Sequence, residues 1–129
     1  MLFTLLSLLA GCPASTDDTS PVGGDITVTN FVQQDCDGDS GTLTEALRAE
    51  AGSSANTVDV EHDAVSATCC VSLAASATAA DGTIHVTYTE GGTPCDCMCH
   101  YDVTYTLGNV PSGDWSVAAG GVSDAVSVP

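Results

Sequence analysis

The sequence predicts an all-β protein: a single antiparallel β-sandwich of about seven short strands with one short helix, placed behind a signal segment and a flexible tether. Two observations lead to this fold class. Apolar and polar residues alternate in short runs, which is the pattern of strands buried on one face. Gly, Pro, Asp and Ser separate the runs at intervals typical of turns.

The alternating runs cover most of the chain from Asp25 onward. They lie at residues 26–28, 58–64, 71–77, 83–89, 95–107, 115–117 and 122–128. The clearest is 95–107, where one face carries Cys95, Cys97, Cys99, Tyr101, Val103, Tyr105 and Leu107 and the other face is polar. Only a strand separates residues in this way, because successive side chains point to opposite faces.

One segment has a helical pattern instead. The sequence from Thr42 to Glu45 has the spacing of a capping box, Leu43 and Leu47 are four residues apart, and Gly52 offers a stop. These signals predict a short helix over residues 43–51.

A turn near the C-terminus carries a family resemblance. Residues 107–117 read LGNVPSGDWSV, which resembles the corner of Ig-like and fibronectin-III-like domains, where an L-x-x-(L/V)-P-x-G-x-(Y/W)-x-V segment links two strands. The resemblance implies an Ig-like sandwich in which Trp115 packs on the bend. It bears on fold and not on function.

The N-terminus carries a second resemblance. Residues 1–9 are almost wholly apolar but too short to span a bilayer, and Leu9-Ala10-Gly11-Cys12 is similar to the bacterial lipobox. The resemblance implies that residues 1–11 are a lipoprotein signal peptide and that lipid on Cys12 anchors the exported protein to the cell envelope. Pro13 after the cysteine favours the outer membrane by the habit of that family. Residues 12–24 are then the lipidated cysteine and a flexible linker, and residues 25–129 are the domain.

Charge narrows the choice of partners. The chain has 17 acidic residues against a single basic one, Arg48, which gives a formal net charge of −16. Such a charge repels phosphate backbones and anionic lipids, so we expect no nucleic-acid binding and a membrane contact made only through the lipid. A protein or another cell-surface ligand is the expected partner.

Cysteine usage predicts disulfides. Of seven cysteines, lipid takes Cys12, and six remain: Cys36, Cys69, Cys70, Cys95, Cys97 and Cys99. An exported small domain favours disulfides. Residues two apart on a strand have Cα atoms roughly 6.5 Å apart, near the limit for a bridge. Each of the last three cysteines therefore pairs with one of the first three, which leaves six of the fifteen connectivities open.

Two points about these cysteines stay open. Cys69 and Cys70 are adjacent and would face opposite sides of a strand, so either one of them sits in a bend or the Cys95–Cys97 segment is loop. Three thiolates on one face, together with Cys69 or Cys70, are also a candidate site for Zn²⁺ or Cu(I).

Two further patterns are candidate metal sites. Asp35, Asp37 and Asp39, with Glu45 further on, resemble the opening of EF-hand and dockerin calcium loops, the alternative being a solvated acidic turn. If residues 83–89 and 96–106 form a hairpin, His85 lies opposite His100, and the two imidazoles can share zinc or copper.

The third histidine, His62, and the lack of an active-site pattern in the sequence also bear on function. His62 shares parity with Val58 and Val60 and is expected to be a partly buried edge residue. No nucleophile–base pair and no paired carboxylate set emerges from the sequence. We therefore expect a non-enzymatic envelope lipoprotein that presents the sandwich as a binding or structural module, with a metal-binding lipoprotein as the alternative.

Overall fold

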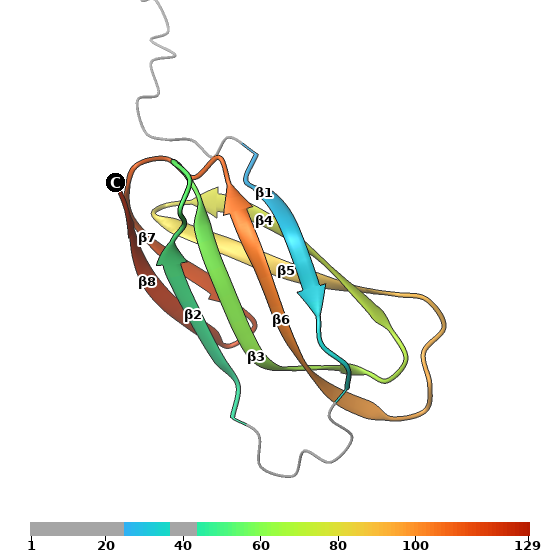
Figure 1. The fold of residues 1–129 in the computed structure, drawn as a ribbon. Coiled ribbons are helices and arrows are strands. Elements are labelled where there is room, and N and C mark those ends of the chain that lie inside the picture. The colour runs from blue at the N-terminus through green and yellow to red at the C-terminus, as the bar shows by residue number, and fades with distance from the viewer. Residues whose placement is uncertain (1–24, 37–43) are drawn as a thin grey trace, which may run out of the picture.

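The computed structural model describes residues 25–36 and 44–129. Eight strands make up this part of the chain: β1 (Thr27–Gln33), β2 (Ala46–Ala51), β3 (Val58–Thr68), β4 (Ser72–Ala80), β5 (Thr83–Gly91), β6 (Met98–Gly108), β7 (Gly113–Ala119) and β8 (Val122–Val128). They form two four-stranded sheets, one in the order β1-β6-β3-β2 and one in the order β4-β5-β7-β8. Figure 1 shows the first sheet lying across the second in a sandwich-like arrangement. The expected all-β class is confirmed.

The helix expected over residues 43–51 is wrong. Residues Ala46–Ala51 form β2 and pair with the first half of β3. Leu47 and Ala49 are buried while Arg48 and Glu50 are exposed, so the segment follows a period of two, which the neighbouring sheet rewards more than the weak capping signal. Thr42 and Leu43 lie outside the described residues. Over 25–36 and 44–129 no helix is long and apolar enough to cross a membrane.

The pairing is not wholly antiparallel, which corrects a second expectation. Five of the pairs between neighbouring strands are antiparallel, but β5 and β7 run parallel. The chain leaves β5, crosses to the first sheet as β6 and returns as β7, so β7 runs in the same direction as β5. A parallel pair needs such a crossover, and here a strand of the opposite sheet provides it.

Alternating side chains build the core as expected. On β6 the predicted inward face is buried from Cys99 to Leu107, and Val58, Ile84 and Val117 have no exposed surface. Residues 107–117 carry the chain from β6 in one sheet to β7 in the other, and Trp115 Nε1 donates a hydrogen bond to the Pro111 carbonyl at 2.8 Å. Trp115 is buried at this crossing between the sheets.

Two β-bulges re-aim side chains in the first sheet. On β3 the register shifts between His62 and Val65, and Ala64 has a φ of 58° while its amide donates to Asp102 Oδ1. On β1 the register shifts between Thr29 and Val32. An extra residue in one strand lets side chains on both sides of the bulge face the core.

The two sheets are incomplete at the same end of the sandwich. β2 pairs with Val58 to Asp63 of β3 only, and β7 pairs with Thr83 to Val86 of β5 only. Residues 65–68 of β3 and 87–91 of β5 therefore each have one edge that no strand among the described residues covers. We call the fully paired end the paired half, and the end containing these open edges and the cysteines the cysteine half.

Candidate functional site

A cleft of about 710 Å³ opens between the sheets at the uncovered edges. β3 lines one wall and β5 the other, with Val65, Ala67, Leu73 and Val86 as its apolar surface. Glu45 and Glu90 also line it, together with His62 and Tyr88, and no Lys or Arg does. The cleft thus combines an apolar surface with two carboxylates and a few hydrogen-bonding groups, as ligand sites commonly do.

His62 stands where the cleft meets the core. Only 1 % of its surface is exposed, so it is a core residue and not the partly buried edge residue expected. Its Nε2 lies 2.8 Å from Glu45 Oε1, and its Nδ1 lies 2.8 Å from the Tyr88 hydroxyl. The Tyr88 hydroxyl in turn lies 2.8 Å from that of Tyr105. These four side chains form one hydrogen-bonded chain from the cleft into the core, which we call the polar chain.

The fold explains how the polar chain is assembled. The bulge after His62 keeps this side chain inward and then returns Val65 to the same face. The bulge on β1 lies opposite Tyr105 and places Phe31 against it, with ring centroids 5.8 Å apart and stacked planes. Aromatic packing of this kind holds both phenols in one orientation while their hydroxyls reach the histidine.

Hydrogen positions in the polar chain follow from the donors available. When Nε2–H of His62 donates to Glu45, Nδ1 accepts the Tyr88 hydroxyl proton, and Tyr88 accepts from Tyr105. Burial raises the pKa of the Tyr88 phenol, and its hydrogen bond to Tyr105 and the nearby Glu45 raise that pKa further. Burial also raises the pKa of Tyr105, against the opposing effect of the bond to Tyr88. Both phenols are therefore protonated at neutral pH and remain hydrogen-bond donors.

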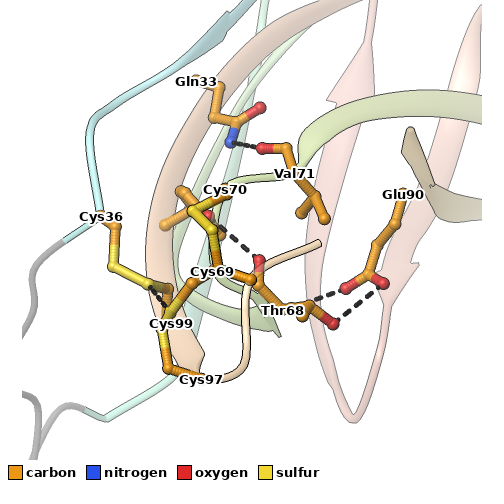
Figure 2. Close-up of a disulfide and its surroundings, with 11 residues drawn as sticks. Gln33, Cys36, Thr68, Cys69, Cys70, Val71, Glu90, Cys97 and Cys99 are labelled. Atoms are coloured by element: carbon orange, nitrogen blue, oxygen red, sulfur yellow. Dashed lines mark hydrogen bonds between the residues drawn. A yellow bond between two sulfur atoms is a disulfide. The ribbon is translucent and has the colours of Figure 1, made fainter. Parts of the chain in front are cut away.

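The two carboxylates of the cleft are held by different contacts. Glu45 lies over the β7–β8 turn, where Gly120 has a φ of 59° and a Cβ would come within 3.0 Å of Glu45 Oε1. Glu90 accepts hydrogen bonds from the amide of Thr68 at 2.7 Å and from its hydroxyl at 3.2 Å (Figure 2). Glu90 thus joins the end of β3 to β5 across the cleft.

Three disulfides secure the cysteine half. They join Cys36 to Cys99, Cys69 to Cys97 and Cys70 to Cys95, with Cα–Cα distances of 5.5, 5.3 and 5.4 Å. This is one of the six connectivities that the sequence left open, and each of the three later cysteines pairs with one of the three earlier ones, as expected. Figure 2 shows the first two bridges side by side, with Cys36 reaching in from the segment after β1.

The two arrangements considered for the adjacent Cys69 and Cys70, a bend at one of them and a loop at Cys95–Cys97, are both present. Cys70 has a φ of 68°, which turns the chain between Cys69 and Cys70. Cys95 and Cys97 precede β6 and are not part of a strand, although backbone hydrogen bonds join both to Cys69. The bend and the loop let two neighbouring cysteines reach two partners on one segment.

The expected histidine pair is not formed. β5 and β6 lie in different sheets, so His85 is opposite Thr78 and Ala118 while His100 is opposite Ser66. The hairpin expected between residues 83–89 and 96–106 is wrong, because the loop after β5 crosses to the other sheet and two disulfides hold that loop to Cys69 and Cys70. His85 and His100 therefore cannot share a metal ion across a hairpin.

The other metal candidates fare differently. Of the four residues of the candidate calcium loop, Asp37 and Asp39 lie outside the described residues. Asp35 lies in the segment after β1, and Glu45 is hydrogen-bonded to His62. Among the described side chains, Cys36, Cys69 and Cys99 are close enough to share an ion. Their sulfur atoms belong to disulfides here, and a disulfide sulfur is not the thiolate that zinc or copper requires.

Sequence reasoning missed the polar chain. Its members come from β3, β5, β6 and the residue before β2, and their meeting depends on two bulges that have no sequence signal of their own. The usable hint was parity: His62 follows Val58 and Val60 on the inward face of one run. A histidine at an inward position needs partners for both ring nitrogens.

Comparison with protein-family models, with curated proteins and with solved structures found no match for this chain.

Proposed function

We propose that this chain is an exported lipoprotein, anchored to the cell envelope through lipid on Cys12, whose β-sandwich domain is a non-enzymatic binding module. The observation that carries the binding role is the cleft between the two open edges. It has apolar walls, two carboxylates and a rigid polar chain behind them.

The disulfides support export. Three bridges in a domain of this size form in oxidising compartments and are rare in the cytosol. They use six of the seven cysteines, and the seventh is Cys12 of the lipobox-like Leu9–Cys12 sequence. The cysteine count therefore agrees with a lipid anchor at that position, and two or more acyl chains suffice to hold a protein stably on a membrane.

The polar chain supports binding over catalysis. Its phenols have raised pKa values and its histidine is shielded from solvent, so neither group is poised to attack a substrate. A rigid, fully hydrogen-bonded arrangement suits a site that must keep its shape for a ligand.

The Ig-like type is part of the proposal. It is supported by the corner at residues 107–117, where Trp115 bonds to Pro111 while the chain changes sheets. An Ig-like assignment has to include the parallel pairing of β5 with β7.

The anchor is tested by labelling cells with a radioactive or clickable fatty acid and comparing wild type with Cys12→Ala. We expect label in the wild-type protein only, and recovery of the wild type, but not the variant, in the membrane fraction. Equal labelling of both proteins would contradict the anchor.

The binding role is tested by blocking the cleft with Glu90→Trp, a substitution at an exposed residue that lines the cleft and lies on the same face of β5 as Val86 and Tyr88. Glu50→Trp on β2 is the matched control, since Glu50 is also an exposed carboxylate but lies outside the cleft. After cross-linking of intact cells, we expect a cross-linked adduct with wild type and with the control, and its loss in Glu90→Trp. An adduct unaffected by Glu90→Trp would contradict binding through the cleft.

A further inference from the structure

We propose that the cleft binds an extended, basic peptide segment, which adds a strand to the open edge of β3 and places cationic side chains against Glu45 and Glu90. This inference rests on the proposed binding role and names the class of partner.

The edge of β3 is built for an additional strand. β6 covers one side of residues 65–68, whereas β2 stops opposite Asp63, so the other side has no strand partner among the described residues. An uncovered edge presents backbone donors and acceptors that a further strand can satisfy. Lysine is a common protection of such edges, and this chain contains none.

The direction of the free amide follows from its neighbours. The Cys69 amide donates to the Cys97 carbonyl, next to β6, at 2.9 Å, and the Thr68 amide donates to Glu90 at 2.7 Å. Backbone amides alternate in direction along a strand, so the Ser66 amide points as Thr68 does, away from β6 and toward the open edge. Glu90 thus caps the last position of the edge and leaves Ser66 as the pairing position.

Charge selects the kind of segment. Glu45 and Glu90 line the cleft without any Lys or Arg, and the whole chain carries −16. The only basic residue, Arg48, is engaged with Glu61 and Asp63 on β2 and β3. A second copy of this chain would bring another −16 to the cleft and is disfavoured, whereas a basic segment is attracted to it.

The length of the wall sets the length of the segment. Ala46 of β2 pairs with Asp63, so Glu45 stands at one end of the open edge, and Glu90 contacts Thr68 at the other end. Four extended residues pair along residues 65–68, roughly 10 Å from end to end, and the residues that flank them reach the carboxylates, so a segment of about seven residues is long enough. Apolar side chains at alternate positions would then meet Val65 and Ala67, and basic side chains near the two ends would meet the carboxylates.

The probe for this proposal is a fluorescent heptapeptide of the sequence Lys-Thr-Val-Thr-Val-Thr-Lys, in which the lysines and the valines share one face of the extended chain. It is titrated with the oxidised full chain in detergent and followed by anisotropy. One comparison peptide has Glu in place of Lys. A second keeps both lysines but is N-methylated at alternate residues, so that it retains its charge and loses the donors of a strand. We expect binding of the first peptide, weakened by salt, and more than tenfold weaker binding of the other two.

Matched variants locate the site. Glu45→Gln and Glu90→Gln should each weaken binding about fivefold, the effect of one partly exposed charge pair. Glu50→Gln removes the same charge from β2 outside the cleft and should change binding less than twofold. Ser66→Pro removes the edge amide and should abolish binding, while Ser66→Ala, which keeps the amide, should bind as wild type. Melting temperature confirms that each variant is folded.

Several results would overturn the inference. Equal binding of the N-methylated peptide would show that charge alone attracts it, and equal weakening by Glu50→Gln would place the contact outside the cleft. A dimer that Ser66→Pro dissociates would assign the edge to a second copy. The proposed function can outlive these failures, because lipid labelling and loss of the cross-linked adduct in Glu90→Trp are measured without the peptide.

Discussion

The paired half and the cysteine half of the sandwich are held together in different ways. In the paired half β2 lies along β3 and β7 lies along β5, so each sheet has all four of its strands there. Val58, Leu107 and Val117 are completely buried. In the cysteine half two strands have open edges, a cleft separates the sheets, and three disulfides join the chain segments.

The difference shows how a small domain can keep a cleft open. Removing a flanking strand from each sheet gives up backbone hydrogen bonds and apolar contacts on both sides. Covalent bonds replace those contacts without filling the space, since they restrict the unfolded chain more than they add packing. The polar chain lies between the paired half and the cysteine half, because His62 is near the end of the part of β3 that β2 covers.

Reduction of the disulfides should have the largest effect. Bridges with sequence separations of 63, 28 and 25 residues each contribute between about 2 and 4 kcal/mol to the free energy of unfolding. We expect hydrogen exchange in the reduced chain to rise first in residues 65–72 and 87–99, with the paired half protected longer. Exchange that rises uniformly would mean that the bridges hold both halves equally.

Loss of apolar packing in the paired half should rank second. Leu107→Ala removes a side chain with no exposed surface and should lower the free energy of unfolding by about 2–5 kcal/mol. Val32→Ala on β1 is the matched control, because Val32 is 51 % exposed, and it should cost less than about 0.5 kcal/mol. Urea titration of the oxidised proteins measures both; similar losses would remove the distinction between core and edge.

Breaking the polar chain should cost less than breaking the core. His62→Leu fills the same space with an apolar side chain but leaves Glu45 and the Tyr88 hydroxyl without their histidine partner. The free energy of unfolding should fall by about 1–3 kcal/mol. His85→Leu, at an exposed position on β5, should be nearly neutral. A His62→Leu protein as stable as wild type would show that the polar chain serves the cleft and not the fold.

The sequence predicted what depends on local alternation and missed what depends on long-range pairing. The inward face of β6, the strand Val122–Val128 and the partition of the cysteines followed from the period of two and from bond geometry. Placing β5 beside β6 failed because nearness in sequence was taken as pairing, whereas the chain changes sheets there. The helix over 43–51 failed because the buried edge of β3 offered Leu47 and Ala49 a better fit.

The candidate site was less accessible to sequence reasoning than the fold. Bulges at Ala64 and after Thr29 decide which side chains enter the polar chain, and no residue pattern announces either bulge. The cleft itself exists because β2 ends before β3 does and β7 pairs with only the first part of β5. Composition does not reveal how far two strands pair.

The smallest expected effect is the response of the polar chain to alkali. The pKa of Tyr105 is raised by burial, and the pKa of Tyr88 is raised as well, whereas both phenols ionise near pH 10 in the unfolded chain. Their contribution to stability is therefore complete below about pH 10 and is lost as pH rises toward the folded pKa values, by at most about 1.4 kcal/mol per pH unit for each phenol.

Tyr105→Phe tests this response most directly. Because the variant has one fewer buried phenol, its free energy of unfolding should fall less steeply above pH 10 than that of wild type. Urea titrations at pH 9, 10 and 11 give the slope, and absorbance at 295 nm follows ionisation of the phenols. Equal slopes in both proteins would mean that Tyr105 ionises as easily in the folded protein as in the unfolded one. Water would then reach the polar chain as far as Tyr105.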